Sequence, residues 1–443
     1  MLPLATMDHC EGIITVAVPA PLYQCYDYLP PADCPLTAIR PGMRLRVPFG
    51  RSTKIALVLG SAARSEVAQH RLKRARALLD REPLLPPAML SLLQWAADYY
   101  HHPLGEVIFS ALPALLREGH PPLGQTRRRY RLTPAGNTLD PGEPRRAPRQ
   151  AALLELLRQH PEGLEQSWLQ AQGGDWRGAL RALETKGWLA REDIADHDIH
   201  CGEPAGDYRP HPLHIAQQAA ADAVCQGLGQ FRPFLLEGVT GSGKTEVYLH
   251  IIEQVVQRGL QALVLIPEIG LTPQLVQRFR EHLRLPLAVL HSGLTDRQRL
   301  HAWVAALQGE APVVIGTRSA VFTPLRRPGV IIIDEEHDPS FKQQDGFRYH
   351  ARDIAVMRAR RCAIPVVLGS ATPSLESLHN AATGRYGHLR LERRAGGATP
   401  PHIRLIDIRH QRLDHGLSPP LLSAVGEHLR DDHQVLKKNK VLI

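Results

Sequence analysis

Cysteine is scarce in this sequence: its 443 residues include 6, at positions 10, 25, 34, 201, 225 and 362. No two of them form the C-x-x-C pair that is typical of a structural zinc site, and their scatter suits a reducing compartment. Long apolar runs are also missing. No stretch approaches the roughly 20 apolar residues of a membrane span, and the N-terminus has no apolar segment of signal-peptide type. We therefore expect a soluble, cytoplasmic protein without a membrane partner.

What the sequence does have is enough apolar material for several folded units and a moderate excess of positive charge. Hydrophobic residues make up 43% of the chain, and this share and length allow about two to four domains. Lys and Arg number 53 against 44 Asp and Glu, a formal net charge of +9. The excess favours polyanionic partners such as nucleic acid, although a basic enzyme with other substrates would fit the charge equally well.

The first part of the chain alternates short apolar runs with Pro and Gly. Residues 11–60 contain β-branched segments, at 13–18 and 43–50 among others, which predict a small β-domain. Between residues 86 and 116 the apolar spacing becomes helical. We assign residues 11–116 to one mainly-β N-terminal domain.

Two linkers and a small helical unit are expected in the middle of the chain. Residues 117–149 are rich in Arg, Pro and Gly, a composition typical of a basic linker or an exposed hairpin. Residues 150–194 show three helical patterns before Gly187-Trp188-Leu189, which suggests a winged helix, although a generic helical spacer fits as well. The three patterns cover 150–159, 164–172 and 176–186. Residues 195–212, rich in Pro and Gly, predict a second linker.

Residues 213–436 alternate apolar runs with amphipathic helical patterns. This alternation predicts an α/β fold in which helices cover both faces of a parallel sheet. The expected strands are 234–237, 262–266, 287–290, 313–315, 330–333 and 366–368.

The most specific motif is Gly-Val-Thr-Gly-Ser-Gly-Lys-Thr at 238–245, which fits the P-loop pattern between an expected strand and an expected helix. Lys244 would neutralise the β- and γ-phosphate oxygens of ATP, and the Thr245 hydroxyl would bind Mg²⁺. Phosphates would also be held by the loop residues themselves, namely Gly238, Thr240, Gly241, Ser242 and Gly243. A chance match in a Gly-rich loop is the alternative, and the flanking pattern argues against it.

An apolar run at 330–333 ends in Asp334 and Glu335, which would place both acids at the carboxyl edge of the sheet. Asp334 would hold Mg²⁺ through water, and Glu335 would orient or deprotonate the attacking water, as in a Walker B motif. An acidic cluster after a strand is more often a solvated loop, but the upstream P-loop favours the catalytic interpretation.

Three further strand ends carry small polar residues. Ser370-Ala371-Thr372 follows the last expected strand, and the segments 267–274 and 316–320 offer amides, hydroxyls and the Arg318 guanidinium to a phosphate backbone. Each could be an ordinary capped loop if it stood alone.

In this order and spacing, these stretches resemble motifs I, Ia, Ib, II and III of the superfamily 2 helicases. The resemblance implies a RecA-like lobe that binds ATP, in which Gln217 or Gln218 would contact adenine. Further segments are similar to the primosomal replication-restart helicases, including G-V-T-G-S-G-K-T-E-V-Y, P-E-I-G-L-T-P-Q, H-S-G-L, G-T-R-S-A-V-F-T-P, D-E-E-H-D, G-S-A-T-P-S, R-V-P-F-G and W-A-A-D-Y-Y-H-H-P-L-G. A P-loop kinase or transporter subunit would share only the first motif.

In the family that the chain resembles, the N-terminal β-domain captures the 3′ end of a nascent strand at a stalled fork. The matching positions here are Tyr26, Asp27, Gly50 and Lys73. Tyr26 would stack on the terminal base, Asp27 would accept a hydrogen bond from the 3′-hydroxyl, and Lys73 would contact phosphate. Ordinary packing within the domain is the alternative for each residue.

Residues 338–352 resemble the family's aromatic-rich loop, which couples DNA binding to ATP hydrolysis. Aromatic side chains interleaved with Lys and Arg suit single-stranded DNA, and the candidates are Phe341, Lys342, Phe347, Arg348, Tyr349 and Arg352. The alternative is that the three aromatic side chains simply cover the sheet. The resemblance also implies forked DNA, single-stranded DNA-binding protein and other primosome proteins as partners of a monomeric protein.

The resemblance fades after residue 436. Residues 437–443 look like an aberrant tail, where the family continues into a second RecA-like lobe with an arginine finger and zinc-binding cysteines. Zn²⁺ is therefore expected from the family only, since its ligands are not in this sequence. Two interpretations stay open: a 3′-to-5′ DNA helicase of replication restart that lacks its second lobe, and a fork-binding fragment that binds nucleotide with little turnover.

Overall fold

The computed structural model describes residues 12–62, 64–122, 126–139, 147–165, 168–169, 176–195, 212–394 and 405–431. The chain divides into a unit of residues 1–394 and a unit of residues 395–443. Among the described residues, no helix is both long and apolar enough to cross a membrane. The predicted linker at 195–212 lies almost entirely outside the described residues, and the predicted tail at 437–443 lies entirely outside them.

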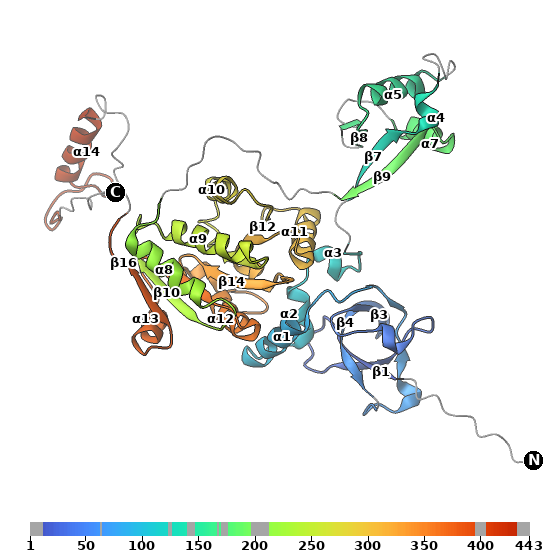
Figure 1. The fold of residues 1–443 in the computed structure, drawn as a ribbon. Helices are drawn as coiled ribbons and strands as arrows, with labels where there is room; N and C mark the ends of the chain where they lie inside the picture. The colour runs from blue at the N-terminus through green and yellow to red at the C-terminus, as the bar shows by residue number, and fades with distance from the viewer. Residues whose placement is uncertain are drawn as a thin grey trace, which may run out of the picture. The chain divides into compact units, whose positions relative to one another are not determined.

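The N-terminal domain is built on a six-stranded sheet with the order β5-β2-β1-β4-β3-β6 (Figure 1). Its strands are β1 (Ile13–Ala17), β2 (Tyr26–Leu29), β3 (Arg44–Phe49), β4 (Ser52–Ala62), β5 (Lys73–Arg74) and β6 (Ala77–Leu78), with short 3-10 turns at Leu36–Ala38 and Gln69–Arg71. Alternating apolar residues of β1, β3 and β4 fill its core, as the period-2 pattern predicts.

Three helices follow this sheet: α1 (Pro87–Tyr99), α2 (Leu104–Ser110) and α3 (Ala114–Arg117). Helix α2 lies so close to the sheet that a Cβ at Gly105 would stand 1.8 Å from the Val18 carbonyl oxygen. The fully buried Arg44 guanidinium pairs with Asp80 at 2.7 Å and also donates to the Leu116 carbonyl. The bond from Arg44 to Leu116 joins strand β3 to helix α3.

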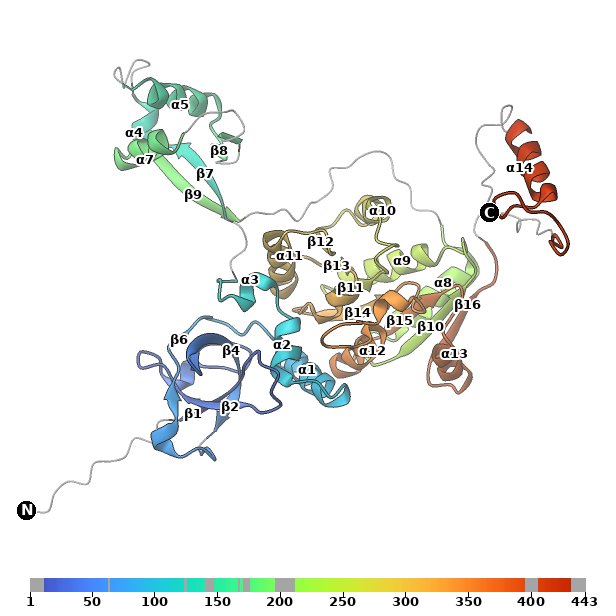
Figure 2. The same cartoon turned by 180° about the vertical axis from the view of Figure 1, so that it is seen from behind.

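A second, three-stranded sheet has the order β8-β7-β9 (Figure 2). It consists of β7 (Thr126–Leu132), β8 (Leu164–Glu165) and β9 (Leu189–Ala195), with helices α4 (Pro134–Asn137), α5 (Pro148–Gln159) and α7 (Arg177–Thr185). Our prediction of a linker at 117–149 was wrong here, because β7 is the central strand of the sheet. The helical pattern predicted at 164–172 begins instead with β8. Tyr130 of β7 lies in one buried apolar cluster with Leu154 and Leu183, so the strand has a core residue among its arginines.

The third part is a seven-stranded parallel sheet of order β12-β13-β11-β14-β15-β10-β16 (Figure 1). Its strands are β10 (Pro233–Gly238), β11 (Gln261–Leu265), β12 (Leu287–Leu290), β13 (Val313–Gly316), β14 (Pro328–Ile333), β15 (Val366–Ser370) and β16 (Gly387–Leu391). Six of these confirm the predicted strands, and β16 was missed. The predicted lobe at 213–436 extends too far, because residues 395–443 form the other compact unit.

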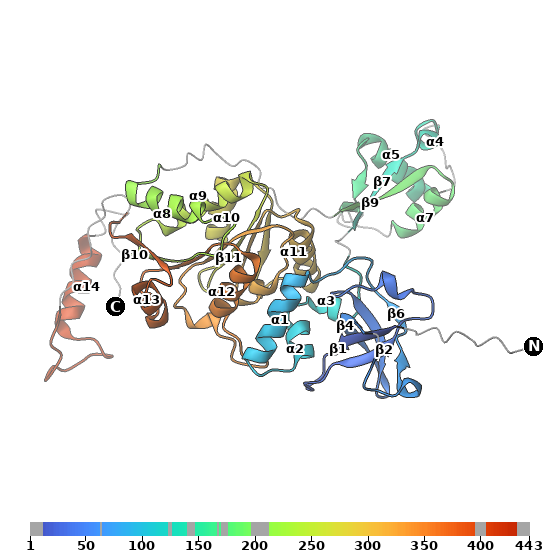
Figure 3. The same ribbon diagram turned by 60° about the horizontal axis from the view of Figure 1, so that its bottom comes forward.

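Helices cover both faces of the parallel sheet (Figure 3). One face packs against α8 (Ile215–Gln226), α9 (Lys244–Gln257) and α10 (Pro273–Leu283). The other packs against α11 (Asp296–Gln308), α12 (Ala351–Cys362) and α13 (Leu375–Ala382), and its apolar cluster continues into α1, α2 and α3. Short 3-10 turns occupy Arg318–Phe322 and Pro339–Phe341. In the second unit, the described residues contain helix α14 (Pro419–Asp431).

Candidate functional site

The loop between β10 and α9 has the backbone of a phosphate-binding turn. Gly241 and Gly243 have φ values of +80° and +83°, in the left-handed region that glycine adopts at little cost. Gly243 is the N-cap of α9 and provides no side-chain cap. At Gly238, a Cβ would stand 2.5 Å from the Ser242 hydroxyl. The uncapped start of the helix leaves N–H groups available to an anion.

Lys244 is the first residue of helix α9 and directly follows the turn. Its side chain is 9% exposed, and its Nζ donates to the Gly238 carbonyl at 3.1 Å and pairs with Glu335 at 3.4 Å. The buried Ser242 Oγ has no hydrogen-bond partner among the described residues. Because buried polar atoms are normally satisfied, this orphaned hydroxyl fits a site completed by a phosphate group. Gly238, Thr240 and Thr245 surround the same turn, with Thr245 half-buried on the first turn of α9.

Asp334 and Glu335 follow β14, which is separated from β10 only by β15. Burial, together with the charge of Glu335, raises the pKa of Asp334. Glu335 has a φ of +46°, rare for a non-glycine residue and a form of strain that clusters at functional sites. The two acids and Lys244 therefore converge, and the donor set of Thr245 and Asp334 suits Mg²⁺, which binds through few protein oxygens.

The two candidate glutamines differ in their surroundings. Gln217 is buried, donates from Nε2 to the Ser242 carbonyl at 2.9 Å and accepts from the His214 amide at 2.8 Å. Gln218 instead pairs with Asp222 on its own helix. Of the two glutamines, Gln217 is therefore the one that binds the P-loop backbone, and the adenine contact stays a prediction.

The Ser-Ala-Thr segment contacts the acidic motif directly. The Ser370 hydroxyl lies 2.8 Å from His337 Nδ1, and the Gly369 carbonyl accepts from the Glu336 amide at 3.0 Å. Thr372 lies 3.4 Å from the other ring nitrogen of His337. These bonds join the ends of strands β14 and β15 directly.

Arg352, predicted to contact DNA, points into the protein instead. Its NH1 group binds the fully buried Glu336 at 3.1 Å and the Ser374 hydroxyl at 2.8 Å. Glu336 also accepts from the Ser374 amide and the Ser377 hydroxyl. A buried carboxylate needs such partners, so Arg352 stabilises Glu336 inside the protein. The sequence pattern could not distinguish this contact from DNA binding.

The aromatic side chains of residues 338–352 are also buried, with Phe341 0%, Phe347 6% and Tyr349 5% exposed. Phe347 lies 5.7 Å from the Tyr100 ring, and Tyr349 lies 4.8 Å from Phe322. Burial raises the pKa of Tyr100 to about 12, and its hydroxyl accepts from the His350 amide at 3.2 Å. The prediction that these three rings stack on DNA is therefore wrong for this arrangement, and the packing alternative holds.

The basic residues near this loop are divided between inward and outward positions. Arg318 donates to the Ser340 and Lys342 carbonyls at 2.7 and 3.2 Å, so it braces the loop. Lys342 binds the Arg348 carbonyl at 2.8 Å and lies over the Tyr100 ring. Arg348 is exposed. Among the predicted contacts in this loop, Arg348 is the one whose side chain is exposed, and its contact with DNA stays a prediction.

The predicted 3′-end residues come together on one sheet of the N-terminal domain. Tyr26 makes an edge contact with Phe49 at 5.2 Å, beside Gly50, whose φ of +57° makes the turn between β3 and β4. Asp27 accepts from Thr15 at 2.8 Å and from Ser65 at 2.5 Å. Lys73 is exposed on β5, which pairs with β2. Tyr26 and Asp27 thus stand on one strand, with Gly50 and Lys73 beside it.

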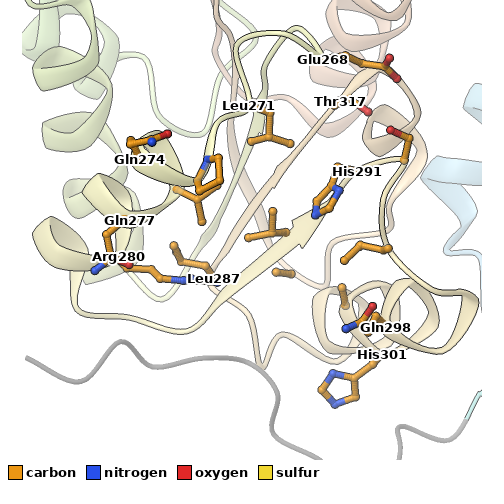
Figure 4. Close-up of a pocket in the computed structure, with 17 residues that line it drawn as sticks. Glu268, Leu271, Gln274, Gln277, Arg280, Leu287, His291, Gln298, His301 and Thr317 are labelled. Carbon is orange, nitrogen blue, oxygen red and sulfur yellow. The ribbon is translucent and has the colours of Figure 1, made fainter.

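A cavity of about 860 Å³ lies between α10, β12 and α11 (Figure 4). Its walls include Glu268 and Gln274 from the segment 267–274, His291 after β12, and Thr317 after β13. Strand β12 is at the opposite side of the sheet from β10 and β15, so this cavity is separate from the P-loop. The segments predicted to meet a phosphate backbone line it.

Comparison with known proteins agrees with this arrangement. The 3′DNA-binding domain (3′BD) model of PriA matches residues 15–113, and the DEAD/DEAH box helicase model matches residues 215–381. The replication restart protein PriA of Haemophilus influenzae is 42% identical over 434 residues, which cover 96% of this chain and 58% of that protein. The chain belongs to the PriA family.

Other comparisons are weaker. The PriA protein of Chlamydia pneumoniae is 38% identical and covers 81% of this chain and 49% of its own length. The chain thus spans about half the length of these PriA relatives. A solved structure of RecG bound to a three-way DNA junction matches 44% of this chain and 25% of the other at 21% identity, with a TM-score of 0.30.

Sequence reasoning missed three residues of this PriA-family site: Tyr248, Glu336 and Gly369. Tyr248 donates from its hydroxyl to Asp334 Oδ1 at 3.0 Å, and Glu336 joins the acidic motif to Arg352. The spacing of four between Lys244 and Tyr248 was an available signal, because such residues share one helix face. Nothing in the sequence alone singles out Gly369.

Proposed function

We propose that this chain acts in replication restart as an ATP-dependent DNA helicase that recognises stalled forks and unwinds DNA 3′ to 5′, which permits primosome assembly and loading of the replicative helicase. The observation that carries the proposal is the convergence of Lys244, Asp334 and Glu335 beside an uncapped helix N-terminus. Magnesium and ATP fit this donor set. The bound cation would neutralise charge on the phosphate oxygens.

Recognition of the fork is assigned to the N-terminal sheet. Tyr26 offers an aromatic face for the last base, Asp27 an acceptor for a 3′-hydroxyl, and Lys73 a cation for phosphate.

The cavity beside β12 supplies a route for a single strand, since Gln274 and His291 line it with the segment that resembles motif Ia. The three-stranded sheet with its helices is proposed to be a winged helix, and single-stranded DNA-binding protein and primosome proteins are proposed partners.

A second candidate is fork binding with nucleotide affinity but little turnover. The ion pair between Lys244 and Glu335 favours it, because a carboxylate held on the lysine is less available to activate water. Hydrolysis measured with and without forked DNA separates the two candidates. Turnover that rises with forked DNA supports the helicase, and binding of both ligands without turnover supports the second candidate.

The nucleotide half is tested by titrating the chain with a fluorescent ATP analogue in Mg²⁺. Lys244→Ala should weaken binding about a hundredfold, since one preorganised cation on phosphate has effects of that order. Lys186→Ala, which removes a lysine from the three-stranded sheet region, is the control and should bind normally. Equal affinity in the two variants would overturn the nucleotide assignment.

The DNA half is tested with forks whose nascent strand ends in a 3′-hydroxyl or a 3′-phosphate. The hydroxyl fork should bind more tightly, and Asp27→Asn should shrink the difference, because the amide keeps only one neutral acceptor oxygen and no longer repels a 3′-phosphate. Asp33→Asn makes the same charge change at an exposed position of the same domain and should keep the preference. A chain that binds both forks equally would contradict capture of the 3′ end.

A further inference from the structure

Tyr248 connects the P-loop helix to the acidic motif. It lies one helical turn after Lys244 on α9 and is 1% exposed. Its hydroxyl donates to Asp334 Oδ1 at 3.0 Å. A fully buried phenol needs a partner for its hydroxyl, and here the partner is the carboxylate expected to face the nucleotide cation.

The phenol reaches Asp334 by crossing the strand between them. Strand β15 separates β10, which leads into the P-loop, from β14, which ends at Asp334. At Gly369 of β15, a Cβ would stand 1.6 Å from the Tyr248 hydroxyl oxygen and 2.8 Å from the ring carbon that carries it. A side chain at position 369 and a tyrosine at position 248 therefore exclude each other.

Gly369 is also tied to the acidic motif through its own backbone. Its carbonyl accepts from the Glu336 amide at 3.0 Å. The segment that follows β14 is consequently held by two hydrogen bonds. Tyr248 binds Asp334, and Gly369 binds Glu336. The contact between Tyr248 and Asp334 depends on the absence of a side chain at position 369.

We propose that Tyr248 is a positioning residue that orients Asp334 for the cation of a bound nucleotide, and that Gly369 is required because it leaves room for the phenol. This inference rests on the proposed function. Without the phenol, Asp334 can turn toward the positive charge of Lys244, which already holds Glu335 at 3.4 Å. Such an ion pair would take the Asp334 carboxylate away from the cation, so the tyrosine keeps this carboxylate available to it.

The first test is Tyr248→Phe in the full chain, which keeps the ring and removes the hydroxyl. Binding of the fluorescent ATP analogue is measured against Mg²⁺ concentration and again in EDTA. Loss of a hydrogen bond to a charged group should raise the Mg²⁺ concentration for half-maximal binding about tenfold and leave affinity in EDTA unchanged. Tyr130→Phe removes a buried phenol elsewhere and should change neither quantity.

The second test uses Gly369→Ala and the double variant with Tyr248→Leu. The alanine methyl overlaps the phenol, so Gly369→Ala alone should weaken nucleotide binding both with Mg²⁺ and in EDTA. Adding Tyr248→Leu should restore binding in EDTA but leave the tenfold Mg²⁺ defect, because the clash is relieved while the hydroxyl stays absent. A double variant no better than Gly369→Ala would contradict the steric pairing.

The outcomes separate this inference from the function on which it rests. A wild-type chain without Mg²⁺-dependent nucleotide binding would overturn the proposed function and the inference together. A normal wild-type response with an unshifted Tyr248→Phe curve would overturn the inference alone. An equal loss for Tyr248→Phe with Mg²⁺ and in EDTA would also overturn it, because the tyrosine would then support the fold and not the cation.

Discussion

The nucleotide site and the aromatic loop at residues 338–352 were both expected to bind a ligand, yet their polar groups are arranged in opposite ways. At the nucleotide site, helix α9 begins without a side-chain cap and the buried Ser242 hydroxyl has no partner among the described residues. In the aromatic loop, Arg318 binds the Ser340 carbonyl and Lys342 binds the Arg348 carbonyl. The nucleotide site therefore keeps polar groups that a ligand can bind, whereas the polar groups of the aromatic loop bind other groups of the protein.

This difference has a mechanical consequence. A ligand can enter the P-loop without breaking an aromatic contact, whereas DNA can reach the Phe341, Phe347 or Tyr349 ring only if the loop leaves its packing site. Tyr100, at the end of helix α1 in the N-terminal domain, binds the His350 amide and so holds the loop closed. Under the proposed function, DNA would have to release this contact before it could bind the buried rings.

The largest expected effect comes from Phe341→Ala. The ring is fully buried in the main apolar cluster, so its removal should lower the free energy of unfolding by about 4 kcal/mol. Urea denaturation of the variant and of Ile215→Ala, which changes a 92% exposed side chain, measures the difference. If Phe341→Ala kept wild-type stability and lost only DNA affinity, the ring would belong to a DNA surface.

A somewhat smaller loss is expected for Glu336→Ala. Removal of this fully buried carboxylate leaves Arg352 without its main partner inside the protein, which should cost about 3 kcal/mol. Glu376→Ala is the matched control, because Glu376 is 72% exposed at 4.0 Å from the same arginine. Thermal denaturation of both variants tests the contrast. Equal melting temperatures would show that Arg352 finds its support elsewhere.

The same contrast explains which features the sequence could predict. The P-loop requires glycine at positions of positive φ and a lysine at the start of a helix, and few other folds impose that order on Gly241, Gly243 and Lys244. Six strands of the parallel sheet were likewise evident, because strands buried on both faces appear as continuous apolar runs. Backbone requirements of this kind can be recognised from neighbouring residues in the sequence.

Features that depend on contacts between residues far apart in the sequence could not be recognised in this way. Aromatic and basic residues between 338 and 352 suit a DNA surface and a packed loop equally, and only contacts with Tyr100 and Phe322 decide between them. Strand β7 was mistaken for a linker because its arginines hid Tyr130, whose partners come from α5 and α7. The proposed role of Gly369 depends on Tyr248, which lies more than a hundred positions earlier, so no local pattern encodes it.

Tyr100→Phe should loosen the closed loop by a smaller amount. The variant keeps the ring contacts with Phe347 and loses the hydroxyl that accepts from the His350 amide, a change of about 1 kcal/mol. Hydrogen exchange at the His350 amide should become faster by about fivefold, which is the same energy expressed as a rate. Tyr99→Phe, at a neighbouring 59% exposed ring, is the control. Unchanged exchange in Tyr100→Phe would mean that packing alone closes the loop.

The smallest expected effect separates outward from inward residues of the loop. Arg348 is exposed, so Arg348→Ala should leave the melting temperature unchanged and weaken binding of single-stranded DNA about threefold, with a salt slope shallower by roughly one unit. Arg258→Ala, beyond the C-terminal end of helix α9 and far along that helix from the P-loop, removes an equally exposed charge and should change neither quantity. DNA affinity is measured by fluorescence anisotropy over a range of salt concentrations. An Arg348→Ala variant with the wild-type slope would leave the closed loop without a contact to DNA, because Lys342 binds a backbone carbonyl and Arg352 binds Glu336.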